Sequence, residues 1–391
     1  MNYNNPIPST ISHVIRLLTV VLFALFSFLY LFCLQCDVLA EAQYVFSGGV
    51  TSYSRFWGAL IITVTLLGVQ YVVAKLTKLT GRWYALTFFP SFLLLAFLTS
   101  LNRAVIADFS LHQWVWALPL LIVVFLVILY LRRKLPGESI SEGDYHLSRY
   151  LWPNFLVLFL MMLLCGANSS ADDVYMYELK AERLLLEKDY EAASRVGEKS
   201  LMTSPRLNEL RMYALAQKGQ LGERLFDYPQ PYGDQSLMLM NDTVTRLHRF
   251  TCKDIQETLG AWANLSVTTF QQYIDLLKRN PSTRHNPMLA DYVLCGYLLR
   301  KDLRGFTRDI KHYYDLSSPD KVMELPKAYR EALLLQAKAI GRDSLNAFAD
   351  TLMLAAYRDY SDIKDSDEKE IVRNNRLRRN YGNTLWWHIE Q

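Results

Sequence analysis

Residues 17–34 read LLTVVLFALFSFLYLFCL, eighteen consecutive residues without a charged side chain. A run of this length and apolarity crosses the hydrocarbon core of a bilayer as one helix. Four more such runs follow, so we predict an all-α, polytopic bundle with spans at residues 17–34, 56–74, 83–101, 113–131 and 151–171. The last run turns to small and polar residues after Cys165, so its end is the least sharply defined.

Tryptophan residues mark where these runs begin. Five of the eight Trp residues lie at the starts of the second to fifth runs: Trp57, Trp83, Trp114, Trp116 and Trp152. An indole ring favours the headgroup level of a bilayer, where it meets both lipid and water. The Trp positions therefore support the predicted limits of the spans.

Charge divides the 391 residues into two parts. Residues 1–171 contain ten Lys and Arg and six Asp and Glu, which leaves 32 of each sign, from totals of 42 and 38, for residues 172–391. The division excludes a soluble single-core protein, a secreted disulfide scaffold and a disordered chain. Because the second part has no net charge, it lacks the positive field that nucleic-acid binding needs, and we expect no nucleic-acid partner.

Basic residues in the short loops predict the orientation. The loops within residues 75–82 and 132–149 together hold seven Lys and Arg, whereas the opposite loops hold only Arg55 and Arg103. Lys and Arg in short loops mark the cytoplasmic side. We therefore predict a cytoplasmic N-terminus and an exported C-terminal half, on the periplasmic side of a bacterial inner membrane. The first span lacks a small-x-small cleavage site, so we interpret it as a retained anchor.

Residues 172–391 form the second predicted domain. Their apolar residues recur at helical spacing, and alternating strand patterns with two-residue Gly turns are scarce. We therefore expect this exported domain to be α-helical, after a transmembrane domain at residues 1–171.

Residues 177–221 resemble a tetratricopeptide repeat, a pair of antiparallel helices in a unit of about 34 residues. The matching positions are Tyr177, Ala181, Tyr190, Ala193, Ser200 and Pro205. Two positions depart from the family pattern, Lys180, where the family has Leu, and Gly197, where it has a large aromatic residue. The resemblance implies that Ala193 and Ser200 lie on one second helix.

Weaker copies of the same pattern follow. The first helix of a second pair ends at the turn of residues 219–221, and Pro229 and Pro231 cut its partner short. The turn at residues 301–303 links two further helical runs, and residues 327–340 and 344–357 fit one more pair. The spans, the repeats and an aromatic tail at residues 381–387 together resemble a family of uncharacterised, multi-pass membrane proteins of Bacteroidota. That resemblance implies a membrane location and no particular activity.

The repeats suggest a binding role. Stacked helix pairs leave a concave groove that holds a peptide or an extended segment of a partner. Groove-facing residues lie on the first helix of each pair, so the predicted partner-binding residues are Tyr177, Lys180, Arg183, Asn208, Arg211 and Tyr213. We expect a protein or peptide partner in the periplasm, in addition to the lipid bilayer. The alternative is that these side chains only face solvent.

Motifs for common enzymatic reactions are missing from the sequence. It contains no GxxxxGK[ST], GxGxxG, HExxH or GxSxG, so no catalytic residue is assigned and no cofactor is expected. The seven His residues are scattered without an i, i+4 pair, and we predict no metal site.

Two short patterns keep a membrane enzyme open as the alternative function. Asp37 and Glu41 follow the first span, where glycosyltransferases that use lipid-linked donors place acidic residues. The competing interpretation is two hydrated loop carboxylates.

The second pattern is a Cys pair. Cys33 and Cys36 form a C-x-x-C whose helical spacing predicts both sulfurs on one face, as in some membrane thiol oxidases. A relay would need a second Cys pair, and the exported loop at residues 102–112 has none. The competing interpretation is two small apolar residues at a helix end. We make no prediction for the redox states of Cys33, Cys36, Cys252 and Cys295.

Overall fold

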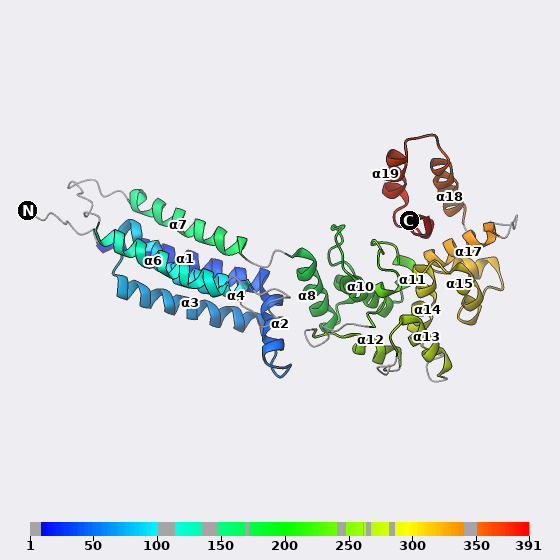
Figure 1. Cartoon of the computed structure of the whole chain (residues 1–391), viewed down its shortest axis with the longest axis horizontal. Helices are drawn as coiled ribbons and strands as arrows, with labels where there is room; N and C mark the ends of the chain where they lie inside the picture. Colours follow the sequence, from blue (N-terminus) through cyan, green and yellow to red (C-terminus); the bar gives the residue numbers. More distant parts are fainter. Residues whose placement is uncertain are drawn as a thin grey trace, which may run out of the picture. The chain divides into compact units, whose positions relative to one another are not determined.

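The computed structural model of the chain describes residues 9–100, 114–134, 147–168, 172–240, 248–260, 262, 267–280, 286–339 and 350–390. Every regular element in these ranges is helical, which confirms the all-α prediction for this part of the chain. The chain divides into two compact units, Met1–Met176 and Tyr177–Gln391 (Figure 1).

The first unit is built from long apolar helices. Five of them have the length and composition to cross a membrane, and each overlaps one predicted span: Thr10–Leu34, Arg55–Thr77, Gly81–Thr99, Trp114–Arg132 and Leu147–Ala167. The elements are α1 (Ser9–Leu29), η1 (Tyr30–Leu34), α2 (Cys36–Phe46), α3 (Arg55–Thr77), η2 (Gly81–Phe88), α4 (Phe89–Thr99), α6 (Trp114–Lys134) and α7 (Leu147–Ala167).

Apolar side chains cover the outside of this unit as well as its inside. Phe23, Leu66 and Leu158 form part of the buried core between the helices. At the same time Trp116 and Trp152 have exposed fractions of 81% and 71%, within rows of exposed Leu, Val and Ile. Exposed apolar surface of this extent is what the acyl chains of a bilayer would cover. The first unit therefore fits a membrane protein.

The third long apolar helix is not α-helical throughout, and Asn154 binds backbone groups of its first half. Its first half, η2, is a 3₁₀ helix, and its second half, α4, is α-helical. Asn154, buried on α7, accepts a hydrogen bond from the Ala85 N–H at 2.7 Å and donates one to the Gly81 carbonyl at 2.8 Å. Irregular backbone at membrane depth requires such partners because lipid offers none.

The second unit contains shorter helices joined by tight turns. They are α8 (Asp173–Leu186), α9 (Tyr190–Ser194), α10 (Pro205–Gln217), α11 (Leu221–Arg224), η3 (Gly233–Ser236), α12 (Cys252–Leu259), α13 (Phe270–Arg279), α14 (Pro287–Leu299), α15 (Leu303–Asp309), η6 (Ile310–His312), α16 (Pro319–Met323), α17 (Lys327–Ala339), α18 (Thr351–Lys364), α19 (Glu370–Tyr381) and α20 (Leu385–Glu390). The predicted helix at residues 344–357 appears as α18, and residues 344–349 lie outside the described part of the chain.

One turn geometry occurs three times in this unit. Lys188, Gly219 and Lys301 each follow a long helix and adopt a left-handed φ of 62°, 64° and 61°. In each case the next N–H donates to the carbonyl five residues earlier, at 2.9 Å: Asp189 to Leu184, Gln220 to Leu215 and Asp302 to Tyr297. This is the Schellman ending of a helix, which reverses the chain sharply. The turns at Gly219 and Lys301 lie at turns predicted from the sequence, and the turn at Lys188 lies just before Tyr190 of the first predicted repeat.

The second helix of the first pair is shorter than predicted. It ends at Ser194, and the chain then turns, so Ser200 does not lie on a helix. The reason is Gly197, whose left-handed φ of 69° cannot continue an α-helix. The departure from the family pattern at Gly197 therefore marks a real change in the fold.

Candidate functional site

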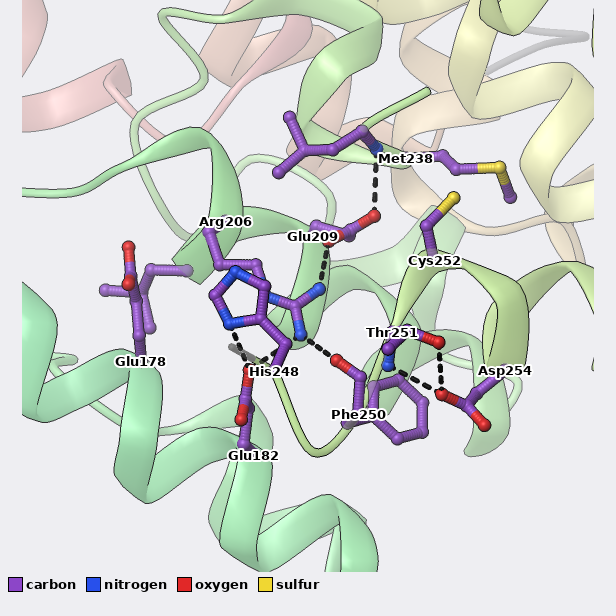
Figure 2. A network of polar contacts seen from close by, with 12 residues as sticks. Glu178, Glu182, Arg206, Glu209, Met238, His248, Phe250, Thr251, Cys252 and Asp254 are labelled. Carbon is purple, nitrogen blue, oxygen red and sulfur yellow. Dashed lines mark hydrogen bonds and ion pairs between the residues drawn. The ribbon is translucent and has the colours of Figure 1, made fainter. Parts of the chain in front are cut away.

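A buried network of charged side chains surrounds Arg206 in the second unit (Figure 2). Arg206 follows Pro205 at the start of α10, where the Ser204 side chain caps the helix by accepting the Leu207 N–H. Its Nη2 lies 2.8 Å from Glu182 Oε1, and its Nη1 binds the Glu209 carboxylate. All three ionic side chains are buried, so the single positive charge of Arg206 faces two carboxylates inside the unit rather than in water.

The same carboxylates hold the chain that follows α10. Glu209 accepts the Leu239 N–H at 2.8 Å. Glu182 Oε1 lies 3.1 Å from Nδ1 of His248, and Arg206 also donates to the Phe250 carbonyl. The network therefore fastens two stretches without long helices, near residues 239 and 250, to α8 and α10.

The electrostatics of the network keep it ionised. Burial opposes a charge on Glu182, but Arg206 and His248 outweigh burial and hold the pKa of Glu182 below its usual range. Burial likewise opposes the charge of Arg206, and Glu209 and Glu182 outweigh it and raise the pKa of Arg206. An acid that stays ionised and a guanidinium that stays charged form a structural clamp more readily than an acid–base pair.

Glu182 and His248 are also side chains of metal-binding type. Among the described residues of the second unit, no third His, Cys, Asp or Glu completes a metal-binding group with them. Protein zinc sites use three or four protein ligands. Glu182 and His248 therefore supply two side chains of this type within the unit.

Arg211 is a second buried arginine of this unit, and it lacks the carboxylate partners that Arg206 has. Its Nε donates to the Val196 carbonyl at 2.7 Å, and its guanidinium lies 4.2 Å from the centroid of the Tyr228 ring. Among the described residues no carboxylate forms an ion pair with it, and Nη2 has no hydrogen-bond acceptor. Burial lowers the pKa of Arg211 to about 10, against the opposing effect of Tyr228 and Tyr177.

The six predicted partner-binding residues separate into two groups. Lys180 on α8 is exposed, and Tyr177 and Arg183 beside it are half-buried, with Arg183 paired to Glu187 at 3.0 Å. The other group lies inside the unit because α10 is covered by α9, α11, α14 and η3. That group consists of Asn208, Arg211 and Tyr213, all buried.

The contacts of Asn208 and Tyr213 bear on the predicted groove. Asn208 donates to the Pro229 carbonyl at 3.1 Å, and the Tyr213 ring packs 4.9 Å from that of Phe250. These side chains hold α10 in place, so the surface left for a partner is that of α8. Partner binding by any of the six residues stays a prediction.

Two further buried acids lie closer to the C-terminus. Asp291 on α14 accepts hydrogen bonds from the hydroxyls of Tyr329 at 2.9 Å and Tyr314 at 3.3 Å, and burial raises its pKa. Glu331 on α17 accepts the Leu385 N–H at 2.7 Å at the start of α20. Burial, which outweighs the nearby Lys327, raises the pKa of Glu331 to about 7.

The structure also places the two patterns after the first span. Cys33 is exposed within the π-helical turn η1, whereas Cys36 is buried at the start of α2, and both are free thiols. The two Cys residues therefore belong to two different helical elements, η1 and α2, and not to one continuous α-helix. Asp37 and Glu41 lie one turn apart on α2 and are buried, in contrast to hydrated loop carboxylates.

Comparison with known proteins adds one similarity. No curated protein and no solved structure matches the chain significantly. One region of the chain, residues 244–390, matches a family model. It begins after Glu182, Arg206 and Glu209, and it includes His248, Phe250, Asp291 and Glu331. Residues 244–390 match a family of unknown function, DUF6057.

Proposed function

We propose that this chain is a membrane protein whose five spans anchor a helical-repeat unit that binds a protein or peptide partner at the cell envelope. The observation that carries the proposal is the turn shared by Lys188, Gly219 and Lys301, because repeated helix pairs of this kind build extended binding surfaces. The five long apolar helices of the first unit supply the anchor.

The tetratricopeptide-like character of the repeats is part of the proposal. Ala181 and Ala193, at two of the family's small positions, are both fully buried, as close helix packing requires. The short α9 departs from the family. We take the repeats to be a shortened variant of the pattern, within a membrane protein of the kind found in Bacteroidota.

The partner-binding surface in this proposal is the exposed side of α8. Lys180 is exposed and forms no ion pair with another described residue, while Arg183, one turn later, is paired with Glu187. A cation without a partner at a helix surface favours an acidic segment of a binding partner, chiefly through orientation and association rate. The proposed location of this surface is the periplasm, on the basis of the basic residues in the loops.

Charge reversal tests the proposal. The full chain is purified from its native membrane in mild detergent, as wild type and with Lys180→Glu and Arg183→Glu together. We expect a discrete partner to co-purify with the wild type and to be lost from the variant, since opposed like charges weaken an interface strongly. The matched control is Arg304→Glu with Lys311→Glu on the exposed side of α15 and η6, which changes the net charge equally. Loss of the partner from both variants, or from neither, contradicts the assignment.

A membrane enzyme is the second candidate, and one observation favours it. Asp37 and Glu41 lie one turn apart on the same face of α2, a spacing at which two carboxylates can act together. A transferase acting on lipid-linked sugars would use them as a catalytic base or for metal binding. Under this alternative, Asp37→Asn with Glu41→Gln abolishes the cellular role, whereas under the binding proposal the Lys180 and Arg183 variant abolishes it.

A further inference from the structure

The helix α19 projects from the C-terminal part of the second unit. It lies beside α18, with which it forms a helical pair (Figure 1). Of its twelve residues only Leu377 is buried, where it joins a small core with Tyr360 and Trp386. A hydrogen bond from the Tyr381 hydroxyl to Asp359 on α18 fixes the end of the helix. These contacts define which face of α19 points outward.

The outward face combines apolar and basic side chains. Ile371 and Val372 have exposed fractions of 77% and 54%. Arg378 and Arg379 follow seven residues later, so each lies two turns along the same side of the helix as its apolar counterpart. Leu377 lies on the opposite side. The face therefore starts with an aliphatic pair and continues with an arginine pair.

The charge on α19 is strongly positive. Its residues include four Arg and one Glu. Arg376 pairs with Glu368 at 2.8 Å, and Arg373 donates to the Ser366 carbonyl. Arg378 and Arg379 form no ion pair with another described residue, and both are exposed. The helix thus offers two guanidinium groups that carry no internal compensation.

We propose that α19 binds the headgroup region of an anionic phospholipid membrane through this face. Guanidinium groups bind phosphate oxygens in bidentate geometry, and the aliphatic pair suits the boundary between headgroups and acyl chains. A soluble polyanion would use the arginine pair but gain nothing from Ile371 and Val372. The five long apolar helices of the same chain tether α19 near a bilayer, which raises its effective concentration there. This proposal stands apart from partner binding on α8.

Vesicle binding by the full chain tests the proposal. The chain is reconstituted in nanodiscs of phosphatidylcholine alone and mixed with vesicles of phosphatidylcholine, with or without phosphatidylglycerol. We expect co-sedimentation only with the anionic vesicles, weakening as salt rises. Because each basic side chain near an anionic surface strengthens binding about fivefold, Arg378→Gln with Arg379→Gln should weaken it about thirtyfold.

Two more variants make the result specific. Ile371→Ser with Val372→Ser should also weaken vesicle binding, without changing the net charge. Arg304→Gln with Lys311→Gln, which removes the same charge from a different exposed helix, should leave binding at the wild-type level. Circular dichroism of each variant verifies folding.

Three results would overturn the proposal. The first is equal loss in the Arg304 and Lys311 control, because the attraction would then be one of overall charge. The second is wild-type binding after loss of Arg378 and Arg379. The third is binding that survives loss of Ile371 and Val372 and is competed fully by soluble polyphosphate, which would identify a soluble polyanion as the ligand.

Discussion

Gly197 lies against the guanidinium group of Arg211. A methyl group added at Gly197 would come within 2.4 Å of Arg211 Nη2 and within 3.1 Å of the Tyr177 ring. The left-handed backbone of Gly197 ends the helical run after α9, and Arg211 then donates to the carbonyl of Val196 just before it. The guanidinium group of Arg211 therefore occupies the space that a side chain at position 197 would need.

Gly197→Ala should accordingly cost more stability than a glycine replacement elsewhere. Gly219 has a similar φ of 64° but open space around its Cβ position, so Gly219→Ala measures the backbone cost alone. We expect about 1–2 kcal/mol for Gly219→Ala and about 1–3 kcal/mol more for Gly197→Ala. Denaturant unfolding of the full chain in detergent, followed by circular dichroism, measures both. Equal losses would show that Arg211 does not constrain this turn.

Removal of Arg206 should destabilise the second unit severely. Arg206→Leu leaves the buried carboxylates of Glu182 and Glu209 without their guanidinium, a change that typically costs about 3–5 kcal/mol. The matched control is Arg224→Leu, which breaks a partly exposed pair with Asp227 and should cost less than about 1 kcal/mol. Thermal unfolding midpoints of both variants at pH 7 provide the comparison, and similar midpoints would refute the clamp.

The pH dependence of the Arg206 effect has a defined sign. Because the folded state lowers the pKa of Glu182, its contribution is present above the ordinary value of 4.5 and is lost as pH falls through the lowered value. In Arg206→Leu the buried carboxylates bind protons more readily, which relieves the unpaired charges. The difference in midpoint between variant and wild type should therefore shrink on acidification.

Glu331 should show the opposite pH dependence. Its pKa rises from 4.5 to about 7 on folding, so its contribution to stability is present below 4.5 and is lost as pH rises through about 7. Glu331→Gln should therefore match the wild type near pH 4 and be more stable at pH 8, by roughly 3 kcal/mol. Glu324→Gln, an exposed acid nearby, is the control. An unchanged difference in melting temperature across this range would contradict the burial of a neutral Glu331.

Reporter fusions test the predicted orientation. A reporter active only outside the cytoplasm should be active when fused after Ser170 or at Gln391 and inactive at Gly81 or Gly137. Ser170, Gln391 and Gly137 lie outside the described residues, so this prediction is based on the basic residues of the loops alone. Activity at Gly137 together with silence at Gln391 would invert the topology.

The sequence was informative wherever a signal is local. Runs of apolar residues located the five long helices of the described residues, and the turns predicted at residues 219–221 and 301–303 coincide with two of the repeated left-handed turns. The Arg206 network could not be found in this way, because Glu182 and His248 lie 24 and 42 residues from Arg206. Arg206 and Glu209 of α10 resemble the charges of a solvated helix, yet both also bind buried groups far along the chain, Glu182 and the Leu239 N–H, which only the fold supplies. For the same reason Asn208 and Tyr213 looked available to a partner.

Site-specific photo-crosslinking in intact cells tests the central proposal most directly. A photoreactive amino acid replaces Lys180 on the exposed side of α8, and in a matched control it replaces the exposed Lys311. The account predicts one discrete cross-linked protein from position 180, absent from position 311 and reduced when Arg183→Glu is added. No product at position 180, or the same products at both positions, would contradict a partner-binding role for this surface.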